Sequence, residues 1–137
     1  FFHLKDKVVQ WDSWDDLKTF KIGVMASDFT ETLLKEKGLK VEAVQESDAN
    51  FKKVLAKRID LYPTSLLVGY HSIHNLFPAE KAALFTNNPK PLKEDDMFIM
   101  FSKQAGPRFL DLFVDGLRKL KASGRYDAIM NEVTSGD

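Results

Sequence analysis

Apolar side chains recur along residues 20–77 in two alternating periods. In some segments every second residue is apolar, as in strands half-buried in a sheet, and in others apolar residues lie three and four positions apart, as on one face of a helix. Each helical run begins with Ser or Ser-Asp, residues that commonly cap helices. Strands are therefore predicted at 20–26, 39–45 and 59–62, and helices at 27–38, 47–58 and 65–77.

The same two patterns continue to the end of the chain. Strands are predicted at 82–86 and 96–102, and helices at 107–124 and 125–133. The first of these helices is amphipathic. The apolar side chains expected to face inward on it are Phe109, Leu110, Phe113, Leu117 and Leu120. Repeated alternation of strand and helix predicts an α/β fold, with a mainly parallel sheet flanked by crossover helices.

Composition narrows the range of functions. Twenty Lys and Arg residues balance twenty Asp and Glu residues in a chain of 137, so the formal net charge is zero. Without net charge or a run of like charges, the chain has no field that would gather nucleic acid or an anionic membrane surface. The absence of cysteine excludes a disulfide framework, thiolate catalysis and cysteine-bound zinc. No apolar stretch approaches the roughly 18 residues that a membrane-spanning helix needs.

Polar residues follow two of the predicted strands, where ligands gather in open α/β sheets. The candidate ligand-binding residues are Ser27, Asp28 and Thr30 after the first strand, and Tyr62, Thr64 and Ser65 after the third. Free N–H groups at a helix start favour an anion, but the Asp28 carboxylate would compete with one. Helix capping without any ligand explains both loops equally well.

The other polar clusters give weaker evidence for a functional site. His71 and His74 share a helix face but have no third metal ligand nearby in sequence, so no metal site is predicted. The acid clusters at 15–16 and 94–96 are expected to be turn caps and solvated loops. Phe101, Phe109 and Phe113 are assigned to core faces, not to a stacking platform for nucleic acid. No catalytic triad, cofactor motif or phosphate loop is found, so no catalytic residue and no cofactor are predicted.

Four segments, taken in order, resemble one protein family. The segments are WDDLKTFKIGVMAS (14–27), FKKVLAKRIDLYPTS (51–65), DDMFIMFSK (95–103) and FLDLFVDGLRKLKASGRYDAIM (109–130). Together they resemble the family 3 extracellular solute-binding proteins, which serve polar amino-acid uptake by ABC transporters. Each motif is weak alone, and their order and spacing make the resemblance specific.

The resemblance implies a two-lobed clamp that closes on a small-molecule solute about a hinge. Residues 1–96 would be the second lobe with the first hinge strand, and 97–137 the return strand and C-terminal helices of a first lobe that is otherwise absent. The hinge strands would lie near 5–11 and 96–102. An ABC permease or a sensor would be the partner, and the location would be periplasmic or extracellular.

Two departures from the family pattern bear on the ligand. Ala26-Ser27-Asp28 replaces a glycine-containing loop that grips the ligand carboxylate, and Ser65 stands where the family has an acid that pairs with the ligand ammonium. The ligand is therefore expected not to be a standard amino acid.

Three alternatives stay open: a lobe that has lost binding, a cleft enzyme of the dehydratase kind using Asp28, Tyr62 and Ser65, and an interaction lobe. The last would expose apolar side chains on the helix at 107–124 and pair as a self-associated or domain-swapped dimer.

Overall fold

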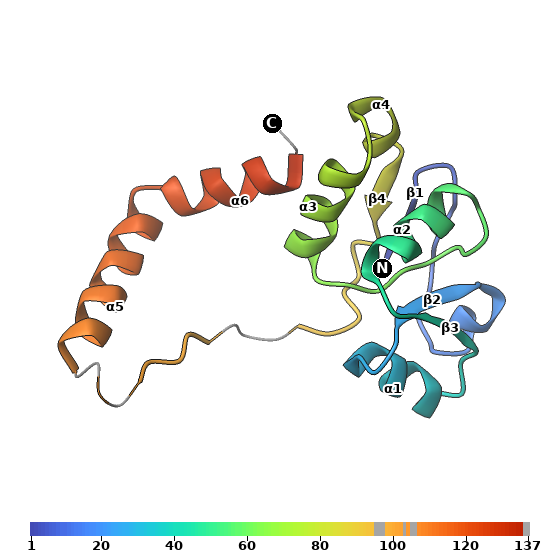
Figure 1. Ribbon diagram of the computed structural model, residues 1–137, viewed down its shortest axis with the longest axis horizontal. Helices are drawn as coiled ribbons and strands as arrows, with labels where there is room; N and C mark the ends of the chain where they lie inside the picture. The colour runs from blue at the N-terminus through green and yellow to red at the C-terminus, as the bar shows by residue number, and fades with distance from the viewer. Residues whose placement is uncertain (95–97, 103, 105–106, 136–137) are drawn as a thin grey trace. The chain divides into compact units, whose positions relative to one another are not determined.

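The computed structural model describes residues 1–94, 98–102, 104 and 107–135. It forms two compact units, Phe1–Leu92 and Lys93–Asp137, which are coloured from blue to yellow and from yellow to red in Figure 1. The first unit holds all four strands of the described chain. The second holds its last two helices. Each unit is described by itself.

The strands of the first unit are β1 (Phe2–Leu4), β2 (Ile22–Met25), β3 (Val41–Val44) and β4 (Phe85–Asn87). β2 and β3 run parallel, and β1 and β4 run antiparallel. Single bridges at Leu61 to β2 and at Tyr62 to β1 join the two pairs into one mixed arrangement. The expected parallel sheet is thus present at β2 and β3, with an antiparallel pair added through β1.

The predicted strand at 59–62 makes single bridges rather than a continuous ladder. The N–H groups of Asp60 and Leu61 both donate to the Lys21 carbonyl, whereas the Tyr62 N–H donates to the Phe2 carbonyl. The segment therefore changes partner from β2 to β1 within two residues. Pro63, which has no N–H, cannot extend the pairing.

The helices of the first unit are short. They are the 3-10 helix η1 (Asp16–Thr19) and the α-helices α1 (Phe29–Glu36), α2 (Ser47–Leu55), α3 (Leu66–Leu76) and α4 (Ala79–Ala82). The first three α-helices fall within the ranges predicted for them. The prediction of a strand from residue 82 is wrong, because Ala82 ends α4 and β4 starts only at Phe85. Pro78 holds the N-cap position of α4, directly before this additional helical turn.

Two apolar clusters cover the sheet. One places Leu17 of η1 and Leu34 of α1 with Ile22 and Val24 of β2, and the other places α2 and α3 with β1 and β4. Phe1 belongs to the first cluster and Phe2 to the second. Both aromatic residues at the start of the chain are therefore buried in the unit's own core.

The second unit contains α5 (Pro107–Ala122) and α6 (Arg125–Ser135). Gly124, with a φ of 73°, lies between them. No residue of α5 is buried, and Phe109, Leu110 and Phe113 are exposed. The prediction that these residues lie in a core is wrong. Leu117 and Leu120 are only half-buried. Two helices packed only against each other cannot bury all the apolar side chains of both.

Neither predicted hinge segment forms a strand. Residues 5–7 make a turn, whereas 8–11 and 98–102 have no regular structure and Phe101 is exposed. Residues 96 and 97, which the second prediction also covered, lie outside the described residues. A strand needs a hydrogen-bonded neighbour. Apart from the Lys5 N–H, which donates to the Leu84 carbonyl at 2.8 Å, the described residues of these segments pair with no strand. None of the described helices has the length and apolar character to cross a membrane.

Candidate functional site

Three loops of the first unit meet at one edge of the sheet. β2 pairs in parallel with β3, from Ile22–Val41 to Met25–Val44, and also bridges in parallel to Leu61. The carboxyl ends of these segments therefore lie together. The loops that follow them are 26–28, 45–46 and 63–65, each leading into an α-helix. This edge, called the carboxyl edge below, is where open α/β sheets place ligands.

The loop after β2 carries three of the predicted site residues. Ser27 and Asp28 are exposed and Thr30 is half-buried. Ser27 adopts φ 65°, which is uncommon for a residue with a side chain. Asp28 holds the N-cap position of α1, but its side chain makes no capping bond and only accepts a long 3.4 Å bond from the Thr30 hydroxyl.

The positive end of α1 already has an anion. The Ser27 N–H donates to the Glu31 carboxylate at 2.7 Å, and that carboxylate also pairs with Lys35 at 2.6 Å. The Lys35 ammonium first, and the Ser27 N–H next, hold the pKa of Glu31 below its ordinary value. An anionic ligand at this helix start would therefore have to displace Glu31 and approach Asp28.

The loop after Tyr62 carries the other three predicted residues. Tyr62 is buried at 2% exposure, Thr64 is half-buried and Ser65 is exposed. Ser65 holds the N-cap position of α3 and its carbonyl accepts the Gly69 N–H at 2.8 Å, but its hydroxyl makes no capping bond. The hydroxyls of Ser27 and Ser65 thus have no hydrogen-bond partner among the described residues.

Asn50 is a buried polar residue that sequence reasoning did not select. It is fully buried on α2, and neither polar atom of its amide makes a hydrogen bond of normal geometry in the described chain. Its oxygen lies against Gly23, where a Cβ atom would come within 2.5 Å. Asn50 is buried on α2 together with Phe51 and Val54, but the sequence alone does not show that this amide is buried.

The pKa of the Tyr62 hydroxyl responds to charged side chains at or just after two of these loops. Burial is the main reason that its pKa is raised, the Thr64 and Asn50 side chains lie close enough to oppose the rise, and the charges of Asp28 and Asp48 add to it. Asp28 and Asp48 therefore both act on the same hydroxyl group. Neither acid has an ion-pair partner among the described residues.

Solved structures resemble the chain in fold. One is described as the second substrate-binding domain of a protein assigned as an amino acid ABC transporter from Streptococcus pneumoniae, with a TM-score of 0.71 and 20% identity over 97% of this chain. Another is an ancestral arginine-binding protein bound to glutamine, with a TM-score of 0.59 and 22% identity over 99% of this chain. This chain has a periplasmic-binding-protein-like fold. The fold expected from the family resemblance is thereby confirmed.

The likeness extends over part of each neighbour. The chain spans 59% of the length of both solved structures. No family model and no curated protein sequence matches the chain. The assignment of 1–96 and 97–137 to two different lobes stays a prediction.

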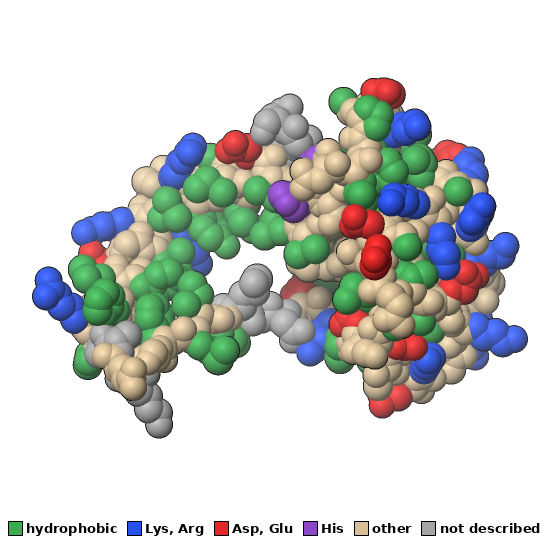
Figure 2. Space-filling model, in the orientation of Figure 1, with side chains coloured by type: hydrophobic (Ala, Val, Ile, Leu, Met, Phe, Trp, Pro, Cys, Tyr) green, Lys and Arg blue, Asp and Glu red, His purple; other side chains and the backbone are tan. Residues whose placement is uncertain are grey.

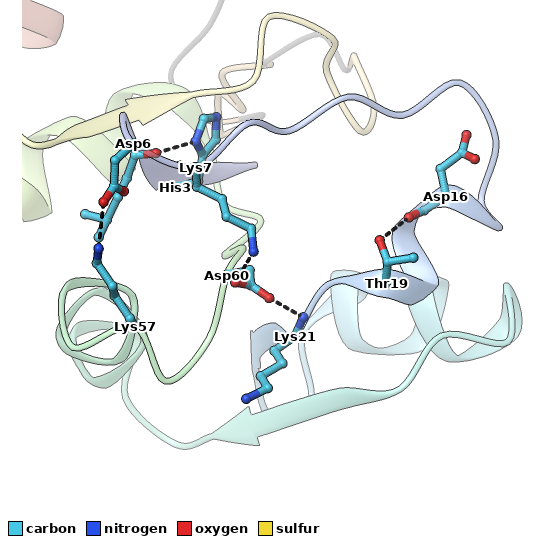
Figure 3. A network of polar contacts seen from close by, with 9 residues as sticks. His3, Asp6, Lys7, Asp16, Thr19, Lys21, Lys57 and Asp60 are labelled. Atoms are coloured by element: carbon cyan, nitrogen blue, oxygen red, sulfur yellow. Dashed lines mark hydrogen bonds and ion pairs between the residues drawn. The ribbon is translucent and has the colours of Figure 1, made fainter.

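The opposite edge of the sheet holds a second polar cluster, drawn in Figure 3. The Asp60 carboxylate accepts the Lys21 N–H at 2.8 Å and pairs with the Lys7 ammonium at 2.8 Å, and Lys57 pairs with Asp6 at 2.6 Å. A shallow pocket lies here, lined by Leu4, Asp6, Lys7, Val54, Lys57, Ile59 and Asp60. Its charged groups already satisfy one another, so the carboxyl edge, with its unpaired groups, is the stronger candidate site.

The remaining predicted clusters have local roles. The Nε2 atom of His71 and the Asn75 amide nitrogen share a hydrogen bond of 2.9 Å, and His74 stacks on Tyr70. The described residues contain no group of three potential metal ligands. Asp16 accepts the N–H groups of Asp12 and Ser13, so it caps a turn as expected. Residues 95 and 96 of the other acid cluster lie outside the described residues.

Proposed function

We propose that this chain is part of an extracytoplasmic solute-binding protein and that its first unit holds a small polar solute at the carboxyl edge. The observation that carries the proposal is a pair of polar groups without a hydrogen-bond partner among the described residues, the Ser27 and Ser65 hydroxyls, at this edge of a periplasmic-binding-protein-like fold. Groups that fail to bond their own chain are free to bond a ligand.

The proposed ligand is not a standard amino acid. Ser65 supplies a hydroxyl where the resembling family has an acid, and loss of such a charge partner costs about 2–5 kcal/mol, or roughly 30-fold to several-thousand-fold in affinity. At the other loop, Glu31 already takes the Ser27 N–H. The ammonium and the carboxylate of an α-amino acid would therefore both find weaker binding partners here than in that family.

The proposed role is binding for uptake or sensing. An ABC permease or a sensor would receive the loaded protein, by analogy with the solved structures, which are described as binding proteins. Asp28, Tyr62 and Ser65 share no hydrogen-bonded relay among the described residues, which favours binding over catalysis.

Calorimetry on the full-length protein against a library of small metabolites tests this function. We expect heat of binding for one solute class, and at least several-fold weaker binding when Ser27 and Ser65 are both replaced by Ala. A matched variant, Ser123→Ala on the second unit, should bind as the parent does. If no solute gives heat or raises the melting temperature, the function is wrong.

A second candidate function is an interaction lobe that pairs with a second copy of the chain. The specific observation is the apolar surface of α5, which Figure 2 shows as hydrophobic side chains along that helix. In a purified sample, the same helix of another copy offers a matching apolar surface. Self-association through α5 is compatible with solute binding by the first unit.

A further inference from the structure

We propose, on the basis of the self-association given above as the second candidate function, that two copies of the chain pair antiparallel through α5. Phe109 of each copy lies on Gly116 of the other, and Arg108 of each copy lies beside Asp115 of the other. The proposal deepens that function by naming the direction, the register and the charged contacts of the pair.

Gly116 makes a notch in the apolar face of α5. With about 3.6 residues per turn, it lies two turns after Phe109 on the same side of the helix. Leu112, Phe113 and Leu120 are its neighbours at spacings of three and four residues. A Cβ atom added at Gly116 would have nothing within 4 Å. Large apolar side chains therefore surround an open place on this face.

A second helix would explain both the notch and the ring that precedes it. Glycine weakens a helix relative to alanine, and its common use is to let another group approach the backbone closely. Phe109 is 60% exposed, so its ring is available to fill such a place. Helices pack by setting the side chains of one into the gaps between side chains of the other.

The apolar face of α5 is complementary to itself. The ring of Phe109 and the notch at Gly116 are seven residues, or about 10.5 Å, apart along the helix. Two antiparallel copies related by a two-fold axis between Leu112 and Phe113 therefore form both contacts at once. In a parallel pair the two rings would lie side by side and both notches would stay open. A two-fold interface needs such self-complementarity, so the fitting occupant is a second copy.

The same register brings opposite charges together. Arg108 precedes Phe109 and Asp115 precedes Gly116, so both charged residues lie along the same border of the apolar face. In an antiparallel pair of helices like borders face each other, which sets Arg108 of each copy beside Asp115 of the other. The Asp115 carboxylate already pairs with Arg118 and Lys119 of its own helix, but it is 41% exposed and has room for a further donor.

Filling the notch tests the packing. In sedimentation equilibrium of the 137-residue chain, Gly116→Leu should raise the dissociation constant of the pair by at least about tenfold. Leucine adds apolar surface and favours the helix, so unspecific adhesion of apolar faces would instead become stronger. The control Ala122→Leu adds the same side chain at an exposed position on the polar side of α5 and should not weaken the pair.

Charge reversal tests the register. Arg108→Glu and Asp115→Arg each bring like charges together at two points and should each weaken the pair by about tenfold or more. A mixture of the two variants should associate again, because each copy then meets opposite charges on the other. Neither a loss of helix stability nor unspecific adhesion predicts recovery on mixing. Circular dichroism confirms that each variant keeps its helices.

Separate outcomes overturn the inference and the function on which it rests. If the parent associates but Gly116→Leu associates as tightly, or the mixture of charge variants does not recover, self-association stands and this register is wrong. If the parent stays monomeric at every concentration, both fail. A monomeric parent that instead binds phosphatidylglycerol vesicles would assign the apolar face to a lipid surface and would likewise overturn both.

Discussion

At the scale of single residues, Asp60 shows how one carboxylate can join two segments of the first unit. Its carboxylate, 23% exposed, joins the Lys21 N–H to the Lys7 ammonium and so ties the start of β2 to the turn after β1. Burial works to raise its pKa, but the Lys7 and Lys21 contacts prevail and hold the pKa below the ordinary 3.8. The folded state therefore favours the ionised Asp60 carboxylate, and the ionised carboxylate in turn stabilises the folded state.

Replacing Asp60 by Asn should lower the free energy of unfolding by about 1–2 kcal/mol near neutral pH, because a charged hydrogen-bond partner is lost. A lowered folded pKa means that this stabilisation is fully present above 3.8, the value for the unfolded chain, and is lost as the pH falls through the folded value. Urea unfolding of both proteins across this range measures the difference.

The matched control for Asp60 is Asp6→Asn. Asp6 also pairs with a lysine, but its side chain is 61% exposed and solvent screens the pair. Its replacement should change stability less than that of Asp60. Equal losses for the two variants, or an Asp60 effect that persists in acid, would contradict the role given to Asp60.

At the scale of elements, the two helical glycines have opposite surroundings. A Cβ atom on Gly69 of α3 would collide with the ring of Phe2, which is 1% exposed and lies edge-on to the rings of Phe51 and Tyr70. Gly116 of α5 has nothing within 4 Å of its would-be Cβ. Gly69 thus allows α3 to pack closely against β1. Gly116 has no such packing role among the described residues, and glycine stabilises a helix less than alanine does.

We therefore expect Gly69→Ala to lower the free energy of unfolding by about 1–3 kcal/mol, as overpacking does. Gly116→Ala should leave stability unchanged or raise it by up to about 1 kcal/mol, because alanine favours the helix. Thermal and urea unfolding of the two variants provide the comparison. A tolerated alanine at 69 would mean that Phe2 has room to move.

The hydrophobic pattern predicts the elements of the first unit better than their pairing. β2, α1, β3, α2 and α3 all fall within their expected ranges, because each has an internal period and a local start signal. The partner change at Leu61 and Tyr62 was not predictable, since it depends on where Phe2 lies. Asn50 was missed for a related reason: the polar face of a helix is visible in sequence, but the burial of one amide is a tertiary fact.

At the scale of the whole chain, the two units differ in how they use apolar residues. The first unit packs its aromatic residues into or against two apolar clusters, with the exception of Phe29, which is 52% exposed. In the second, Phe109, Leu112 and Val114 of α5 are 60%, 61% and 54% exposed. A single exposed apolar residue is ordinary, but several on one helix mark a surface that binds another apolar surface.

We expect the 137-residue chain to self-associate through α5. Light scattering should show a mass that rises with concentration above the 15.6 kDa of one chain. Replacing Phe109 and Leu112 together by Ser should return the mass toward that of a monomer. These side chains are exposed, so their loss should leave the fold of the first unit intact. The control Val8→Ser removes an even more exposed apolar side chain, 78% exposed, from the first unit and should not change the association. A parent chain that stays monomeric at every concentration would show that the apolar surface of α5 does not recruit a second copy.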